Sequence, residues 1–229
     1  MSENHLLTAL PVEERERLLP HLERVPLPLG DVIYEAGEPI RDVYFPTSGV
    51  VSLLCTIDDG ASIEVGTVGM EGVAGVSVFL GADASPNRAL VQVAGEAMRM
   101  KSEVFRELAE QRGRFHHLLH LYTYALLTQM SLSVACNRFH SVERRLARWL
   151  LMMHDRAQVD EFQLTQELIS RMIGTRRPHV STAVGNLHNA GLIRNGRGKI
   201  HILDRQGLVG VACACYLTSK EMFDGLFNA

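Results

Sequence analysis

Several features of membrane and exported proteins are absent from this chain. No apolar run approaches the roughly 20 residues that a membrane-spanning helix needs. The first seven residues, MSENHLL, lack the basic and apolar blocks of a signal peptide. Four cysteines in 229 residues are few, which is typical of reduced thiols. We therefore expect a cytoplasmic protein with no membrane partner.

Histidine is missing from residues 25–100. A metal-dependent enzyme built on a small β-barrel would need His and Glu on its strands, so this absence argues against enzyme activity. His116 and His120 have the i, i+4 spacing of metal ligands, but no third ligand is visible. Cys213 and Cys215 are too close for an easy disulfide and lack the second pair of a zinc site. We expect no metal site and treat this pair as thiols without chemistry, with a metal or redox role as the alternative.

What the chain does contain is a basic segment, residues 163–202, with the pattern of a helix-turn-helix and a wing. It holds six Lys and Arg residues against one acid. Thr165 can cap a first helix, Gly174 supplies the turn, and a second helix is predicted from about Arg176 to Ala190. The predicted buried stripe of this second helix is Val180, Ala183, Val184 and Leu187. The alternative, a helical hairpin with a solvated basic face, leaves the cap, turn and wing unexplained together.

The opposite face of the second helix carries small or hydrogen-bonding side chains, which let a helix enter a major groove. An arginine at its N-terminal end can bind guanine O6 and N7 with two hydrogen bonds. The loop Asn195-Gly196-Arg197-Gly198-Lys199 is predicted to form a hairpin tip, with the positive φ of the turn at Asn195-Gly196, and to bring Arg197 and Lys199 to the DNA backbone. The residues expected to contact DNA are Arg176, Arg177, His179, Ser181, Thr182, Arg197 and Lys199.

Charge divides the chain unevenly. Residues 1–136 hold 10 basic and 18 acidic side chains, whereas residues 137–229 hold 13 basic and 8 acidic ones. This asymmetry suggests a sensor joined to a DNA-binding unit. In the first hundred residues, a short helix (Pro11 to about Leu22) precedes short β-rich runs separated by glycines, which favours a small antiparallel barrel or sandwich.

A long apolar helix is predicted from about Arg114 to Ala135. Its predicted coiled-coil seam, with 4-3-4 spacing, is Phe115, Leu119, Tyr122 and Leu126. Homodimerisation through this seam would suit a two-fold DNA site, and the alternative is a core helix of one domain. Residues 137–140 are expected to form a hinge, after which Ser141 caps the next helix.

Together these observations predict an α+β fold in three parts. Residues 1–113 form a sensor domain with an antiparallel, jelly-roll-like β-roll. Residues 114–136 form the dimerisation helix, and residues 137–229 form a winged helix-turn-helix with a C-terminal tail. The function predicted is that of a sequence-specific DNA-binding regulator. The alternative is an interaction or scaffold protein whose DNA-binding domain no longer recognises sequence, which would show no salt-dependent DNA affinity.

With this order of parts, the chain resembles the Crp/Fnr superfamily of bacterial transcription regulators over nearly its whole length. The residues that resemble the opening strands of the family's cyclic-nucleotide-binding-like β-roll are Leu29-Gly30-Asp31-Val32-Ile33-Tyr34, Gly37-Glu38, Val43-Tyr44-Phe45-Pro46 and Gly49. The resemblance implies a homodimer whose paired central helices transmit ligand state to the recognition helices. It also implies double-stranded DNA and RNA polymerase as partners.

Family residues carry over unevenly to the DNA-binding unit. Arg177 aligns with the family's guanine-recognising arginine. Pro178 replaces the acid that follows it in cyclic-AMP-type regulators, and Thr182 replaces a second arginine, so the usual palindrome is not implied. The positions that match DNA-backbone contacts in the family are Thr165, Gln166 and Lys199.

The sensor departs further from the family's ligand site. Cyclic-nucleotide binders use a Gly-Glu pair and an Arg followed by a small residue, whereas here Glu71 follows Met70 and Arg88 follows a longer loop. Glu71 and Arg88 are the candidate effector ligands, for sugar hydroxyls and for an anion respectively. The alternative makes Glu71 a turn residue and Arg88 a surface ion-pair partner. We expect a small-molecule effector other than a cyclic nucleotide, if any, and no certain cofactor. An iron–sulfur sensor is excluded because no cysteine precedes Cys55.

Overall fold

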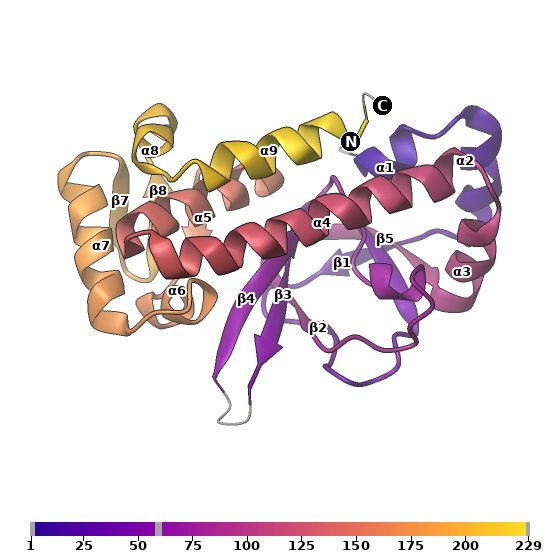
Figure 1. Ribbon diagram of the computed structural model, residues 1–229, viewed down its shortest axis with the longest axis horizontal. Helices are drawn as coiled ribbons and strands as arrows, with labels where there is room; N and C mark the ends of the chain where they lie inside the picture. The colour runs from indigo at the N-terminus through magenta and orange to yellow at the C-terminus, as the bar shows by residue number, and fades with distance from the viewer. Residues whose placement is uncertain (1–2, 58–60, 228–229) are drawn as a thin grey trace.

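The computed structural model describes residues 3–57 and 61–227 and has the predicted α+β architecture. The molecule is elongated, with a β-roll at one end, a helix-turn-helix at the other and one long helix running between them (Figure 1). The strands of the β-roll are β1 (Glu23–Leu27), β2 (Val32–Tyr34), β3 (Asp42–Thr56), β4 (Ser62–Val68) and β5 (Arg88–Lys101). They pair antiparallel in the order β1-β5-β3-β4, and β2 also pairs with β5.

Residues in the long strand β3 serve both ends of the molecule. Phe45 and Val51 lie in the core of the β-roll, whereas Val50 and Leu54 pack in the core of the helix-turn-helix region. Gly49 allows the strand to bend between these parts. Its φ is +78°, and a Cβ there would lie 2.5 Å from the Val93 carbonyl oxygen. The two cores are therefore joined by a continuous strand as well as by helices.

Helices cover the outer end of the β-roll and connect the β-roll to the core of the helix-turn-helix region. The helices of the sensor end are α1 (His5–Thr8), α2 (Val12–Leu18), the 3₁₀ turns η1 (Leu19–His21) and η2 (Val76–Val78), and α3 (Ser102–Glu110). Next come α4 (Arg114–Phe139) and α5 (Val142–Ala157). The predicted hinge is shorter than expected, because residues 137–139 are still helical. The Ser141 cap is confirmed, since its Oγ accepts a hydrogen bond from the Arg144 N–H.

The C-terminal region contains β6 (Glu161–Gln163), α6 (Gln166–Met172), α7 (Arg177–Asn189), β7 (Ile193–Gly196), β8 (Lys199–Ile202), α8 (Arg205–Val211) and α9 (Cys215–Gly225). The last helix, α9, runs back beside α4 toward the sensor end (Figure 1). Tyr216 belongs to the helix-turn-helix core, whereas Phe223 and Leu226 belong to the β-roll core. The end of the chain thus fastens the two cores together.

Helix α4 buries the face that was predicted to pair with a second subunit. The predicted seam residues lie in the core of their own subunit, and none is more than 5% exposed: Phe115, Leu119, Tyr122 and Leu126. That seam is therefore wrong, because the β-roll of the same chain covers this stripe.

A different stripe of α4 is exposed to solvent. Its members follow 3-4-3-4-3 spacing, the period of a coiled-coil seam: His117, His120, Tyr124, Leu127, Ser131 and Val134. Tyr124, Leu127 and Val134 are 62%, 57% and 73% exposed, although all three are apolar. Three exposed apolar side chains in a stripe of this period form the pattern of a helix that packs against a partner.

Candidate nucleic-acid interface

The helix-turn-helix forms from the local signals seen in the sequence. Thr165 caps α6, because its Oγ1 accepts a hydrogen bond from the Leu168 N–H at 3.2 Å. Gly174 has a φ of +58°, a left-handed conformation that favours glycine and ends the first helix. Pro178 lies in the first turn of α7, where its missing N–H has no intrahelical partner. Both ends of the motif are therefore fixed by neighbouring residues.

Helix α7 buries one stripe and exposes the other, as its sequence predicts. The buried residues are Val180, Ala183, Val184 and Leu187. The exposed residues, which include most of those expected to contact bases, are Arg176, Arg177, His179, Ser181 and Thr182. Arg176 is the N-cap and Arg177 the first helical residue, so two guanidinium groups lie at the positive end of the helix dipole. This end can approach base edges and phosphates.

The wing is a three-stranded sheet in the order β6-β8-β7. Its turn is centred on Arg197 and Gly198, whose φ values are +51° and +74°. The hairpin tip lies within the predicted loop 195–199, but the positive φ predicted at Asn195-Gly196 is wrong: Gly196 pairs with Lys199 at the end of the hairpin, and the left-handed residues lie between them. Arg197 is thus exposed at the tip of the wing.

The wing tip lies beside the start of α6. The Leu164 N–H donates a hydrogen bond to the Gly198 carbonyl oxygen at 2.8 Å, which places Thr165 next to the turn. Gln166, the first residue of α6, is half-buried. The Lys199 Nζ lies 2.6 Å from the Glu161 Oε1, and this contact lowers the pKa of the Glu161 carboxyl. A DNA phosphate would have to compete with Glu161 for this lysine.

A groove of about 800 Å³ separates the helix-turn-helix from the β3–β4 hairpin. Arg176 and His179 line one side of it, and Ile57 and Ile63 line the other. Gly174 contacts the hairpin closely, because a Cβ there would lie 2.2 Å from the Ile63 Cδ1. The sensor domain therefore forms a wall beside the N-terminal end of α7.

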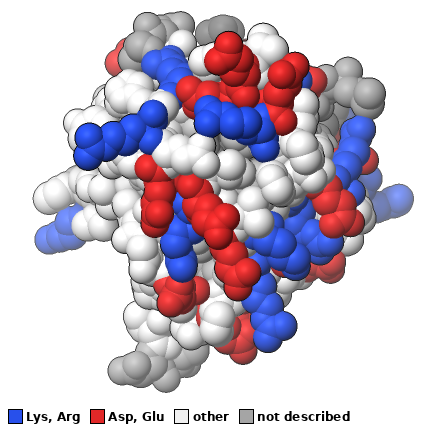
Figure 2. Space-filling view, turned by 90° about the vertical axis from the view of Figure 1, so that its right-hand side faces the viewer, with Lys and Arg blue, Asp and Glu red and all other residues white. Residues whose placement is uncertain are grey.

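Charge at the far end of the molecule differs from that of the helix-turn-helix. Figure 2 views the end that carries α2 and α3, where acidic and basic side chains are interspersed over the surface. Ion pairs such as Arg106–Asp83 and Arg15–Glu3 belong to this sensor end. Mixed charge of this kind does not suit a nucleic-acid backbone, which favours clustered cations.

Across the part of the chain that the structure describes, we find no helix with the length and apolarity to span a membrane.

The two candidate effector ligands do not meet in one pocket. Glu71 is buried, and its Oε1 accepts a hydrogen bond from the Arg156 Nε at 2.7 Å. Arg88 lies at the surface, where its Nε is 3.2 Å from the Glu35 Oε2. Glu71 borders a cavity of about 340 Å³ that does not include Arg88. The predicted Glu71–Arg88 clamp is therefore wrong, because the cationic partner of Glu71 comes from α5.

A second buried carboxylate joins the sensor to α5. Glu64 Oε1 accepts a hydrogen bond from the Trp149 Nε1 at 2.9 Å, and Glu64 Oε2 accepts one from the Ser52 Oγ at 2.5 Å. Burial raises the pKa of the Glu64 carboxyl to about 7, although both hydrogen bonds act to lower it. The folded protein therefore binds the proton of Glu64 more tightly than the unfolded chain does.

Glu64→Gln is expected to remove a pH dependence of stability. Because the folded pKa is raised, the contribution of wild-type Glu64 is fully present below its unfolded pKa and is lost as pH rises through about 7. Glutamine keeps an acceptor for Trp149 and stays neutral. At pH 8 the variant should gain up to about 3 kcal/mol relative to its difference at pH 4.5. Urea unfolding followed by the fluorescence of Trp149, the single tryptophan, measures this. An identical pH profile in both proteins would contradict the assignment.

His116 and His120 do not belong to the group of possible metal ligands found among the described residues. His116 and His120 each place Nδ1 within hydrogen-bonding distance of a backbone carbonyl and pack edge-on against Phe79. A separate cluster of potential metal ligands is formed by Cys136, His140, Cys213 and Cys215. Sequence reasoning missed it because the pairs are about 75 residues apart in the chain. The i, i+4 spacing of Cys136 and His140 was the available signal.

Two family models match the chain. A cyclic nucleotide-binding domain matches residues 24–112, and a Crp-like helix-turn-helix domain matches residues 144–210. No curated protein sequence matches.

Solved structures share the whole architecture at low sequence identity. FixK2 from Bradyrhizobium japonicum has a TM-score of 0.70 at 20% identity, over 84% of this chain and 98% of FixK2. A putative crp/fnr-family transcriptional regulator from Eubacterium rectale has a TM-score of 0.70 at 16% identity, over 90% of this chain and 97% of its own. The c-di-GMP responsive global regulator CLP from Xanthomonas campestris has a TM-score of 0.68 at 18% identity, over 84% of this chain and 99% of CLP. These likenesses show the fold.

Proposed function

Because the chain belongs to the Crp/Fnr superfamily, we propose that it is a homodimeric, sequence-specific transcription regulator that inserts α7 into the major groove of DNA. The observation that carries this proposal is the exposed N-terminal end of α7, where Arg176 and Arg177 project from a helix whose other face is fixed in the core. Thr165 and Arg197, at the start of α6 and at the wing tip, would contact the DNA backbone.

The exposed stripe of α4 is the proposed dimer interface. Paired α4 helices would bury Tyr124, Leu127 and Val134 and would relate two recognition helices by a two-fold axis. Two half-sites about one helical turn apart would then be contacted together. This arrangement favours an inverted repeat as the DNA site. We propose that the protein acts in the cytoplasm, contacts RNA polymerase from its DNA site and has no enzyme activity.

The effector, in this proposal, is a small molecule other than a cyclic nucleotide. Glu71, which would meet a ribose, is already paired with Arg156, and Arg88, which would meet a phosphate, is paired with Glu35 at the surface. A ligand would have to break the buried Glu71–Arg156 pair to use the first of these groups. The cavity beside Glu71 offers the alternative entry point.

Arg177→Ala is expected to relax recognition at one base pair in each half-site. Loss of a two-bonded arginine–guanine contact costs about 1–3 kcal/mol, or roughly 5- to 150-fold in discrimination. Selection of bound sequences from random oligonucleotides, with wild type and variant, measures the change. Arg112→Ala, which removes an exposed arginine between α3 and α4, is the matched control. Recovery of one inverted repeat with unchanged base preference in the variant would overturn the role of Arg177. If wild type enriches no sequence, the scaffold alternative replaces the proposed function.

A further inference from the structure

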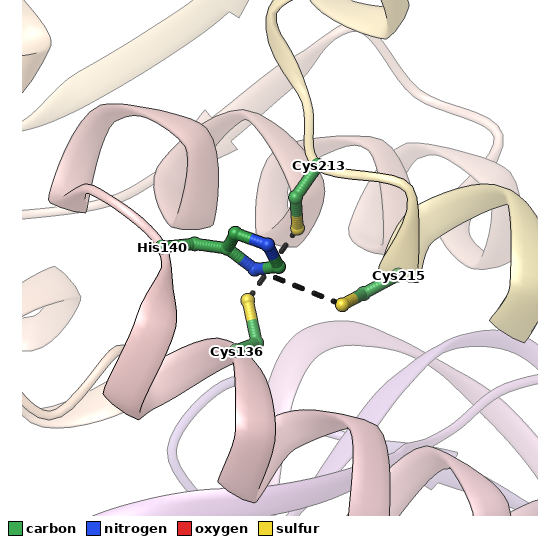
Figure 3. Close-up of side chains that lie close together, drawn as sticks. All are labelled: Cys136, His140, Cys213 and Cys215. Atoms are coloured by element: carbon green, nitrogen blue, oxygen red, sulfur yellow. Dashed lines mark hydrogen bonds between the residues drawn. The ribbon is translucent and has the colours of Figure 1, made fainter.

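Four side chains that can bind a metal converge where α4 ends and where the chain enters α9 (Figure 3). Cys136 and His140 come from the end of α4, Cys213 comes from the segment between α8 and α9, and Cys215 is the first residue of α9. The Cys136 and Cys213 Sγ atoms are 3.5 Å apart, and the Cys215 Sγ lies 3.8 Å from the His140 Nδ1. All four ligand atoms lie within 4.8 Å of one another.

These separations match the edges of a tetrahedral zinc site. With Zn–S bonds of about 2.3 Å and Zn–N bonds of about 2.0–2.1 Å, the edges of a tetrahedron are about 3.8 Å between sulfurs and about 3.6 Å between sulfur and nitrogen. The measured pairs at 3.5 and 3.8 Å are within a few tenths of an ångström of these values. Small side-chain rotations would bring the widest pair, at most 4.8 Å apart, to the same length.

A buried positive charge lies beside the cluster. Cys136 and Cys213 are buried, and the positive charge of Arg148 acts on the Cys136, Cys213 and Cys215 thiols. Arg148 is itself buried: it donates one hydrogen bond to the Ser133 Oγ, while its Nε and Nη1 have no hydrogen-bond partner among the described residues. A buried guanidinium with unpaired donors is costly unless an anionic group lies near. Three thiolates and one divalent cation carry a net charge of −1, which offsets the charge of Arg148.

A simple thiol pair does not account for this arrangement. A disulfide between Cys136 and Cys213 would use two of the four groups and would leave His140 and Cys215 without a reason to face them. Cysteine and histidine together in this number are the ligand set of structural zinc sites. Soft thiolates disfavour magnesium and calcium.

We propose that Cys136, His140, Cys213 and Cys215 form a tetrahedral site for a thiol-seeking divalent metal ion, with zinc as the ion of choice. On binding, the three thiols release their protons to solvent as three metal–sulfur bonds form, and the His140 Nδ1 supplies a neutral ligand. The ion would join the end of α4 to the entrance of α9. It would thereby brace the junction between the sensor and the helix-turn-helix region.

The test is metal content and metal spectroscopy of the full-length protein, purified under reducing conditions without chelator. We expect about one zinc per chain by elemental analysis. After removal of the zinc, added Co²⁺ should give the intense visible bands of a tetrahedral ion and near-ultraviolet bands of thiolate-to-cobalt charge transfer. Cys215→Ser should lower the affinity for Co²⁺ at least 10-fold. Cys55→Ser, at the half-buried cysteine of β3, is the matched control and should leave metal binding unchanged.

Two results would overturn the site. One is wild-type protein that contains no zinc and gives no tetrahedral cobalt spectrum while its thiols are reduced. The other is equal Co²⁺ affinity in Cys215→Ser and wild type. If Cys215→Ser does not fold, the wild-type zinc content and cobalt spectrum decide alone. The readout does not depend on DNA binding, so failure of the metal site and failure of the proposed function are separate outcomes.

Discussion

Leu127→Asp is expected to convert the protein into a monomer and to weaken binding to its DNA site at least 100-fold. Leu127 lies in the middle of the exposed stripe of α4 and is 57% exposed. A carboxylate there would be buried against its own copy across the two-fold axis, which is costly. A monomer contacts one half-site and loses most of the gap between specific binding (Kd of about 10⁻⁸–10⁻¹¹ M) and non-specific binding (about 10⁻⁴–10⁻⁶ M).

The measurement pairs light scattering on a size-exclusion column with fluorescence anisotropy on labelled DNA. Because Leu127 is exposed on the single chain, the substitution should change the free energy of unfolding of that chain little. Leu29→Asp, at an exposed leucine in the β1–β2 connection, is the matched control and should remain dimeric. If the Leu127→Asp protein is still dimeric and binds DNA normally, the dimer interface does not include this stripe.

Arg156→Met is expected to lower the free energy of unfolding by about 3–5 kcal/mol, because it removes the cationic partner of the buried Glu71 carboxylate and leaves it the Gly69 N–H. Arg156 is 7% exposed, and its guanidinium also lies over the Phe223 ring at 5.0 Å from the centroid. One side chain of α5 therefore contacts both the β-roll and α9. The double variant Glu71→Gln with Arg156→Met should recover much of the loss, since no buried charge remains.

Urea unfolding of wild type, of the Arg156→Met variant and of the double variant measures these changes in the free energy of unfolding. The surface pair Arg24–Glu96, in which both side chains are nearly half exposed, provides the control. Arg24→Met should cost no more than about 1 kcal/mol. If the Arg156 single variant is as stable as wild type, or if the double variant is no better than the single one, the pair does not hold the sensor to α5.

Local sequence signals were sufficient for the helix-turn-helix and insufficient for the faces that long-range contacts decide. Thr165, Gly174 and the stripe around Val180 act within a few residues of one another, and the structure confirms all three. On α4, several faces are apolar, so spacing alone could not tell which face the β-roll covers. Phe115 and Leu127 lie on the same helix, in two stripes with the same heptad-like spacing. Only Phe115 packs in the core of the β-roll, whereas Leu127 is exposed.

Predictions from residue identity are wrong or incomplete where the contacting side chain lies far away in the sequence. The sequence predicts that Glu71 binds an effector, because nothing near Glu71 in the chain indicates its true partner, Arg156, which lies 85 residues later. The Cys136–Cys213 contact spans 77 residues, so the spacing of either pair alone indicated no site. In the wing, Asn195-Gly196 is a good turn sequence, but the pairing of β7 with β8 extends to Gly196 and moves the turn on by two residues.

The path of α9 gives the molecule a different topology from the one its sequence order suggests. Phe223 and Leu226 complete the core that α1 and the β-roll begin, and the His5 and Phe227 rings meet edge to face with their centroids 5.8 Å apart. Helices α5 to α8 are thus an insertion within the sensor domain, attached by two chain crossings: residues 140–141 and residues 212–214. His140 lies in the first crossing and Cys213 in the second, so an ion bound at the cysteine–histidine cluster would join the entrance and the exit of the inserted region.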